Sequence, residues 1–139
     1  REREGRMAEQ RIVRLDRNGS GGKGLEHWGD FAPDMVMSGA PVESGHNFYT
    51  DQSGQYTAGV WECTAGKTRI DSFPVDEYCI ILAGRVVITD AQGKREEFKA
   101  GEAFVIPRGF NGTWDMPETV RKFYVIFERK AEAERQAAE

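Results

Sequence analysis

The sequence has few cysteines and histidines, two of each in 139 residues, and it has no long apolar run. Cys63 and Cys79 are too few and too far apart for a disulfide framework or a zinc knuckle, so we expect two buried, reduced thiols. The longest apolar runs, such as residues 79–83, have about five residues, whereas a membrane-spanning helix needs ~20. These shortages exclude a disulfide-stabilised miniprotein and a protein with helical membrane spans.

Blocks of one charge are also missing, since 19 Lys and Arg are interspersed among 23 Asp and Glu, with a net charge of −4. Without a basic stripe, neither nucleic acid nor a membrane surface is an expected partner. The N-terminus has no apolar core of the kind that a secretory signal needs, so we expect a cytoplasmic protein. A phosphate-binding glycine loop and a Ser/His/Asp order are absent too, which argues against nucleotide and nucleophilic chemistry.

What the sequence does contain is a series of short runs rich in Val, Ile, Phe, Tyr and Trp, each closed by a turn signal. This texture predicts an antiparallel all-β domain of about eight strands. The expected strands are residues 57–64, 69–73, 77–82, 85–89, 95–99, 103–106, 112–114 and 122–128. Because so many strands must close or stack to hide their edges, we predict a jelly-roll barrel.

Composition divides the chain into four segments around this barrel. Residues 1–10 are predicted to be tag-like or disordered, residues 11–55 to form an N-terminal arm, residues 56–128 to form the barrel, and residues 129–139 to form a helical tail. The arm is expected to be loosely structured up to about residue 45 apart from a short strand at 11–15, with apolar anchors wrapped over the barrel or a neighbouring subunit. The anchors are Trp28, Phe31, Met35 and Val36.

Two stretches carry glycines at characteristic spacings. Glu77 is followed after six residues by Gly84, and Gly101 is followed by Pro107-Arg-Gly109. These stretches resemble the two sequence motifs of the cupin superfamily, which implies a cupin-type jelly roll. Further elements are similar to a subgroup that includes ethanolamine-utilisation and ureidoglycine-aminohydrolase cupins, much of it of unassigned function. They are Gly59-Val-Trp61-Glu62, Glu77-Tyr78, Gly109-Phe110-Asn-Gly112-Thr-Trp114 and Arg121-Lys122-Phe-Tyr124.

The chain departs from the motifs of metal-binding cupins. Such cupins carry a His-x-His pair shortly before the position of Glu77 and a further His three residues after Gly109, where this chain has Gly112. One carboxylate falls short of the three or four ligands that hold a transition metal firmly. We therefore expect no metal and no cofactor, although His46 with Asp51 and Glu62 leaves a non-conventional metal site open.

Strand alternation places Glu77, Cys79 and Ile81 on one face, which the resemblance implies is the barrel interior. If Lys122 and Tyr124 point the same way, they join Glu77 as catalytic candidates, with Lys122 or Arg69 as the cation facing its carboxylate. The ligand-binding candidates are Trp114, Trp61, Arg69 and Phe110. The competing interpretation is a structural ion pair surrounded by core aromatic residues.

Three functions stay open, and the sequence leaves undecided whether the protein is an enzyme. The first is a cupin-domain protein that binds a small polar metabolite in the barrel without a conventional metal site. The second is a metal-independent acid/base enzyme, such as an isomerase, epimerase or hydrolase of a small acid, amide or sugar derivative. The third is a metal-dependent, aminohydrolase-like enzyme. By analogy with cupins we also expect a homodimer.

Overall fold

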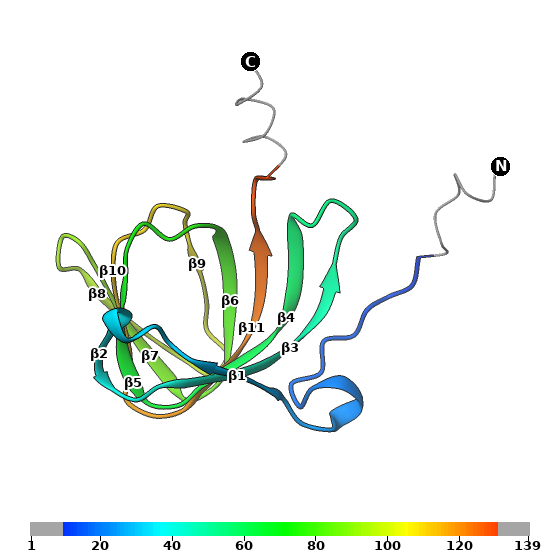
Figure 1. The fold of residues 1–139 in the computed structure, drawn as a ribbon, viewed down its shortest axis with the longest axis horizontal. Helices are drawn as coiled ribbons and strands as arrows, with labels where there is room; N and C mark the ends of the chain where they lie inside the picture. The colour runs from blue at the N-terminus through cyan, green and yellow to red at the C-terminus, as the bar shows by residue number, and fades with distance from the viewer. Residues whose placement is uncertain (1–9, 131–139) are drawn as a thin grey trace, which may run out of the picture.

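The computed structural model describes residues 10–130, which form two antiparallel β-sheets facing each other (Figure 1). The six-stranded sheet has the order β1 (Glu26–Asp30), β3 (Val42–Thr50), β4 (Tyr56–Cys63), β11 (Val120–Phe127), β6 (Asp76–Ala83) and β9 (Ala103–Ile106). The five-stranded sheet has the order β2 (Val36–Gly39), β5 (Gly66–Ile70), β10 (Gly112–Met116), β7 (Arg85–Asp90) and β8 (Arg95–Lys99). Two short 3₁₀ turns, η1 (Ser20–Gly22) and η2 (Pro33–Met35), precede β1 and β2. The prediction of an all-β fold built from antiparallel sheets is confirmed.

Alternation along the two central strands sends one set of side chains between the sheets. On β6 the buried residues are Glu77, Cys79 and Ile81, and on β11 Lys122 and Tyr124 are buried. Because successive side chains of a strand point to opposite faces, this period of two sets the interior of the barrel. The Glu77 face of β6, which the resemblance placed in the interior, is therefore buried, and so is the face of β11 that carries Lys122 and Tyr124, whose direction the sequence left open. No helix within residues 10–130 is long and apolar enough to cross a membrane.

The segment expected to be a loosely structured arm contributes three strands. β1 and β3 extend the six-stranded sheet, β2 borders the five-stranded sheet, and the short strand expected at residues 11–15 is absent. β3 has few β-branched residues, but it pairs with β4 from Glu43 opposite Cys63 to Thr50 opposite Thr57. Pairing with a neighbouring strand thus outweighs the weak local propensity. Of the expected terminal segments, residues 1–9 and 131–139 lie outside the described residues.

The strand expected at residues 69–73 is shifted and is observed as β5 at Gly66–Ile70. β5 pairs with β10 from Gly66 opposite Met116 to Ile70 opposite Gly112. The chain leaves the sheet after Ile70 because Ser72 has a φ of 48°, which a regular strand does not allow.

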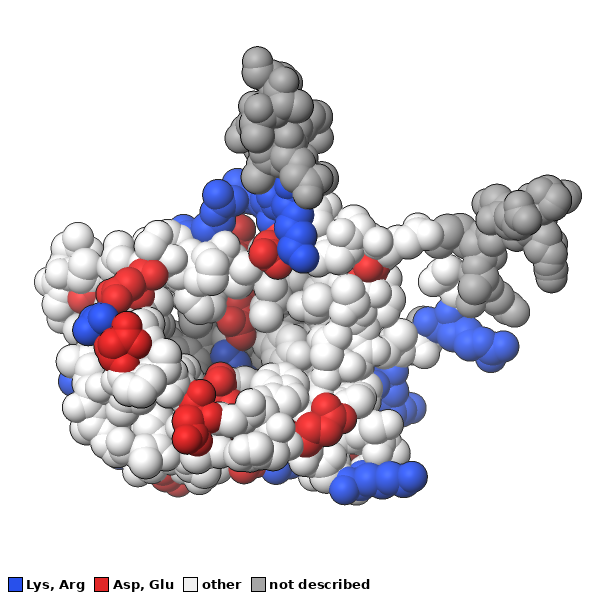
Figure 2. Space-filling model, in the orientation of Figure 1, with Lys and Arg blue, Asp and Glu red and all other residues white. Residues whose placement is uncertain are grey.

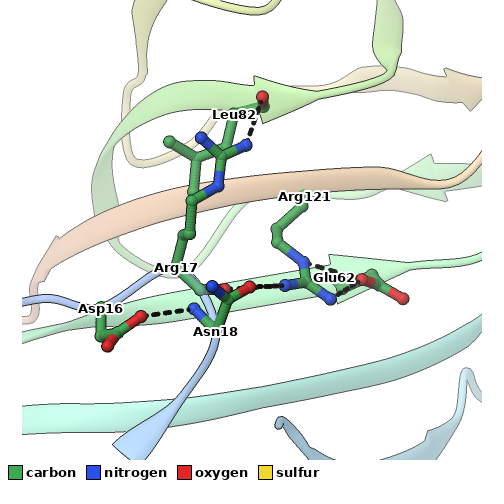
Figure 3. A network of polar contacts seen from close by, with 6 residues as sticks. All are labelled: Asp16, Arg17, Asn18, Glu62, Leu82 and Arg121. Carbon is green, nitrogen blue, oxygen red and sulfur yellow. Dashed lines mark hydrogen bonds and ion pairs between the residues drawn. The ribbon is translucent and has the colours of Figure 1, made fainter. Parts of the chain in front are cut away.

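Residues 16–18 lie against the outer face of the six-stranded sheet (Figure 3). Arg121 Nη1 donates to the carbonyl oxygen of Arg17 at 2.7 Å, and Arg121 Nε donates to Glu62 Oε1 at 2.8 Å. Arg17 Nη2 in turn donates to the carbonyl oxygen of Leu82 at 2.9 Å. The segment before β1 is thereby bound directly to β11 and β6, and through Arg121 it is connected to Glu62 of β4.

Candidate functional site

A cavity of about 600 Å³ lies between the two sheets. This volume is within the range of small-molecule sites, which are concave, mostly apolar and equipped with a few polar groups. Its aromatic walls are Trp28, Phe31, Trp61, Phe73, Trp114 and Tyr124. Figure 2 shows the molecule hollowed on one face, with acidic and basic side chains inside the hollow and acidic side chains around its rim.

A buried ion pair stands in the wall of this cavity. Lys122 Nζ donates to Glu77 Oε2 at 2.7 Å, and the two residues are only 5% and 7% exposed. Cys79 Sγ lies 3.4 Å from both Lys122 Nζ and Glu77 Oε2. The three side chains meet because β6 and β11 are antiparallel neighbours and all three residues point inward. Lys122, and not Arg69, is therefore the cation that faces Glu77.

Two indole rings cover the remaining sides of the Lys122 ammonium group. Its Nζ atom lies 4.5 Å from the ring centroid of Trp61 and 4.7 Å from that of Trp114, distances at which cation–π attraction operates. The two rings meet edge to face at 5.9 Å. Within residues 10–130, Trp114 Nε1 is the one fully buried side-chain nitrogen or oxygen that has no hydrogen-bond partner.

The electrostatics of this cluster keep its protons in place. Burial opposes the charge of Lys122, but the adjacent Glu77 carboxylate more than compensates and raises the pKa of Lys122 above its usual value. Burial raises the pKa of Cys79 to about 12 and that of Tyr124 to about 12. Near neutral pH the site consequently holds an ammonium, a thiol and a phenol, none of which is a base or a nucleophile.

These shifts predict a loss of stability at alkaline pH. A thiol with a raised pKa in the folded state stabilises the fold fully below its unfolded pKa of 9.0, and this contribution is lost as the pH rises toward 12. Each such group lowers the free energy of unfolding by about 1.4 kcal/mol per pH unit in that window. Urea denaturation between pH 8 and pH 11 measures the slope. The double variant Cys63→Ala, Cys79→Ala should have a shallower slope, and a flat wild-type profile would contradict the prediction.

Two residues of β3 complete the polar lining of the cavity. Glu43 Oε2 accepts a hydrogen bond from Trp61 Nε1 at 2.7 Å, and Asn47 Oδ1 accepts one from the Tyr124 hydroxyl at 3.0 Å. The phenol of Tyr124 fits against Gly59, where a Cβ atom would lie 2.5 Å from its oxygen. Sequence reasoning missed Glu43 and Asn47 because it assigned no strand to residues 42–50, although their even spacing was a usable signal.

Only some of the site residues predicted from the sequence lie together in the structure. Glu77, Lys122, Tyr124, Trp61 and Trp114 line the cavity together, as the preceding contacts show. Arg69 also belongs to the lining, but it is half-exposed and its Nε donates to Asp71 at 2.8 Å. Phe110 does not line this cavity and borders a smaller hollow beside Phe98 and Phe104.

The suggested metal ligands do not come together either. His46 Nδ1 lies 2.5 Å from Glu26 Oε2, and Glu62 is bound to Arg121, as described above. Asp51 accepts hydrogen bonds from its own turn, including the backbone nitrogen of Gln55. Within residues 10–130 no group of three or more His, Cys, Asp or Glu side chains is placed to hold a metal ion.

Comparison with known proteins identifies relatives of this fold. Residues 50–124 match the family model described as EutQ-like cupin domain, in agreement with the resemblance inferred from the sequence motifs. No curated protein matches the chain. Among solved structures, a protein of unknown function of the DUF861 family from Pseudomonas syringae pv. tomato is 24% identical with a TM-score of 0.73, covering 81% of this chain and 46% of that one.

Two EutQ proteins have similar structures. The one from Clostridium difficile is 21% identical with a TM-score of 0.56, covering 65% of both chains. A putative ethanolamine utilization protein from Salmonella typhimurium is 22% identical with a TM-score of 0.55, covering 70% of this chain and 77% of that one. This chain thus spans less than two-thirds of the P. syringae and C. difficile chains, and at these identities the likeness concerns the fold.

Proposed function

Because the chain belongs to the family of EutQ-like cupin domains and its sheets enclose a cavity with a buried ion pair, we propose that it binds a small polar metabolite there without a conventional metal site. The observation that carries this proposal is the convergence of polar groups on an aromatic cavity of about 600 Å³. Small-molecule sites combine apolar walls with a few placed polar groups in the same manner. A cytoplasmic location remains part of the proposal.

The ion pair is better explained by binding than by stability alone. Buried ion pairs contribute little net stability compared with apolar residues of similar volume, because both charges lose their hydration. Glu77 uses only Oε2 toward Lys122 and Cys79, and its Oε1 makes no hydrogen bond within residues 10–130. This oxygen is also not among the fully buried atoms without a partner, so it opens to the cavity and offers an acceptor to a ligand.

The Glu77 carboxylate also supports one alternative function, that of a metal-independent acid/base enzyme. Since Lys122, Cys79 and Tyr124 hold their protons near neutral pH, Glu77 is the group of this cluster left to act as a base. An isomerase, epimerase or hydrolase of a small acid, amide or sugar derivative would use it in this way. In a binding protein, loss of the Glu77 charge should weaken the affinity for the metabolite. In an enzyme, it should abolish turnover.

The test is native mass spectrometry of the purified protein, followed by a metabolite screen against wild type and Glu77→Gln. We expect a metabolite to bind the wild type and to bind Glu77→Gln at least about tenfold more weakly, because an amide replaces a charged acceptor. Glu96→Gln, on the exposed strand β8, is the matched control. Turnover that collapses in Glu77→Gln while affinity survives would favour the enzyme, and a screen without any wild-type binder would contradict both.

We also propose that the protein forms a homodimer through the outer face of the six-stranded sheet. Tyr78 and Val105 are direct partners on β6 and β9 and are 45% and 60% exposed, with Val125 of β11 on the other side of Tyr78. Adjacent exposed apolar residues favour association with another protein surface. Light scattering at micromolar concentration should give a dimer for wild type and for the turn variant Gln92→Lys. Val105→Lys should give a monomer, and a monomeric wild type would contradict the proposal.

A further inference from the structure

Among the described residues, five charged side chains line the cavity, and four of them form two ion pairs. Glu77 is bound to Lys122 at 2.7 Å, and Asp71 is bound to Arg69 at 2.8 Å. Within residues 10–130, Glu43 is the one charged residue of the lining that has no oppositely charged partner. The described lining therefore carries one uncompensated negative charge.

The Glu43 carboxylate is held in place and has an oxygen to spare. Its Oε2 accepts the hydrogen bond from Trp61 Nε1 at 2.7 Å. Its Oε1 makes no hydrogen bond within residues 10–130 and is not one of the fully buried atoms without a partner. The charge acts on the barrel interior as well, because it adds to the effect of burial in raising the pKa of Cys63. A ligand in the cavity thus meets a fixed anionic acceptor.

Aromatic residues share the cavity lining with this carboxylate. Trp61 donates to it directly, and Trp28 and Phe31 belong to the same lining. Trp28 can lie close to β3 because Gly45, two residues after Glu43, has no side chain, and a Cβ atom there would lie 2.5 Å from the indole ring. A carboxylate combined with tryptophan and phenylalanine faces is the chemistry that recognises alkylammonium groups, through charge and cation–π attraction together.

The cations of the lining are poorly placed to attract an anionic ligand instead. The Lys122 ammonium is enclosed by Glu77, Cys79 and the faces of Trp61 and Trp114. Arg69, already bound to Asp71, is half-exposed. The chain itself shows a cation resting on the indole of Trp61, since Lys122 Nζ does so at 4.5 Å.

We infer that the metabolite is an organic cation whose alkylammonium group binds Glu43 within the aromatic walls formed by Trp28, Phe31 and Trp61. This inference rests on the proposed function and names the class of its ligand. The alkyl groups contact the rings, while the positive charge neutralises the one unpaired carboxylate of the described lining.

Three probes of one branched skeleton test the inference, namely choline (cationic), 3,3-dimethylbutan-1-ol (neutral) and 3,3-dimethylbutanoate (anionic). Titrations are followed by nitrogen-15 NMR of the three tryptophan indole N–H groups, with the Trp61 signal as the local reporter. We expect choline to bind about tenfold more tightly than the neutral alcohol and the anion to bind most weakly. Choline should also shift the Trp61 signal.

Glu43→Gln is the decisive variant, because its amide oxygen still accepts from Trp61 while the charge is gone. Its affinity for choline should fall to that for the alcohol, and Glu96→Gln should bind as wild type does. Equal or tighter binding of the alcohol or the anion by wild type overturns the cationic ligand and leaves cavity binding supported. If none of the three binds at millimolar concentration, the inference is overturned, and the metabolite screen decides separately on the proposed function.

Discussion

Lys122→Met is expected to lower the free energy of unfolding by about 3–5 kcal/mol, because it leaves the Glu77 carboxylate buried without its cation. Methionine has a volume close to that of lysine, so packing against Trp61 and Trp114 changes little. Urea denaturation at neutral pH measures the loss.

A double-mutant cycle separates the charge from the packing. In Glu77→Gln, Lys122→Met the interior holds no charge at this pair, so most of the loss in Lys122→Met should be recovered. If the losses of the two single variants simply add, the two side chains do not act as a pair.

Gly84→Ala is expected to cost about 3 kcal/mol or more. Gly84 joins β6 to β7 with a φ of 78°, a conformation that costs other residues about 1–2 kcal/mol. A Cβ atom there would also overlap the carbonyl oxygen of Thr119, a backbone atom that cannot move without displacing β11. The two penalties act at the same position.

Gly93→Ala is the matched control for this effect. Gly93 lies in the turn between β7 and β8 with a φ of 89°, but a Cβ atom there would have nothing within 4 Å. Its replacement should therefore cost only the conformational term of about 1–2 kcal/mol. Equal losses in thermal or urea denaturation for Gly84→Ala and Gly93→Ala would show that the contact with Thr119 is unimportant.

Alternation made the interior of the central strands predictable. On β6 and β11 a side chain's face depends only on its position in the strand, so Glu77 could be grouped with Cys79, and Lys122 with Tyr124, before any packing was known. Alternation alone left open whether the face of Lys122 and Tyr124 is the buried one. The cation facing Glu77 could not be chosen in this way. The pairing of β6 with β11 brings Lys122 to it, whereas Arg69 on β5 is bound to the nearby Asp71.

The residues of the site that could not be predicted depend on contacts between distant parts of the chain. Glu43 and Trp61 are 18 positions apart, and Asn47 and Tyr124 are 77 apart. Such contacts exist only once β3 has joined β4, and the even spacing of Glu43 and Asn47 indicates a strand without identifying its partner. Phe110 was predicted to bind the ligand because its motif resembles that of the subgroup. Its ring instead borders the smaller hollow beside Phe98, which the motif alone could not indicate.

The two buried thiols make this chain convenient for site-specific labelling. Cys63 and Cys79 are inaccessible in the fold, and burial keeps them protonated near neutral pH, so maleimides should leave the native protein unmodified. A cysteine introduced at Gln92, in the turn after β7, would then be the one reactive thiol among residues 10–130. Spin labels or fluorophores can accordingly be attached without first removing the native cysteines.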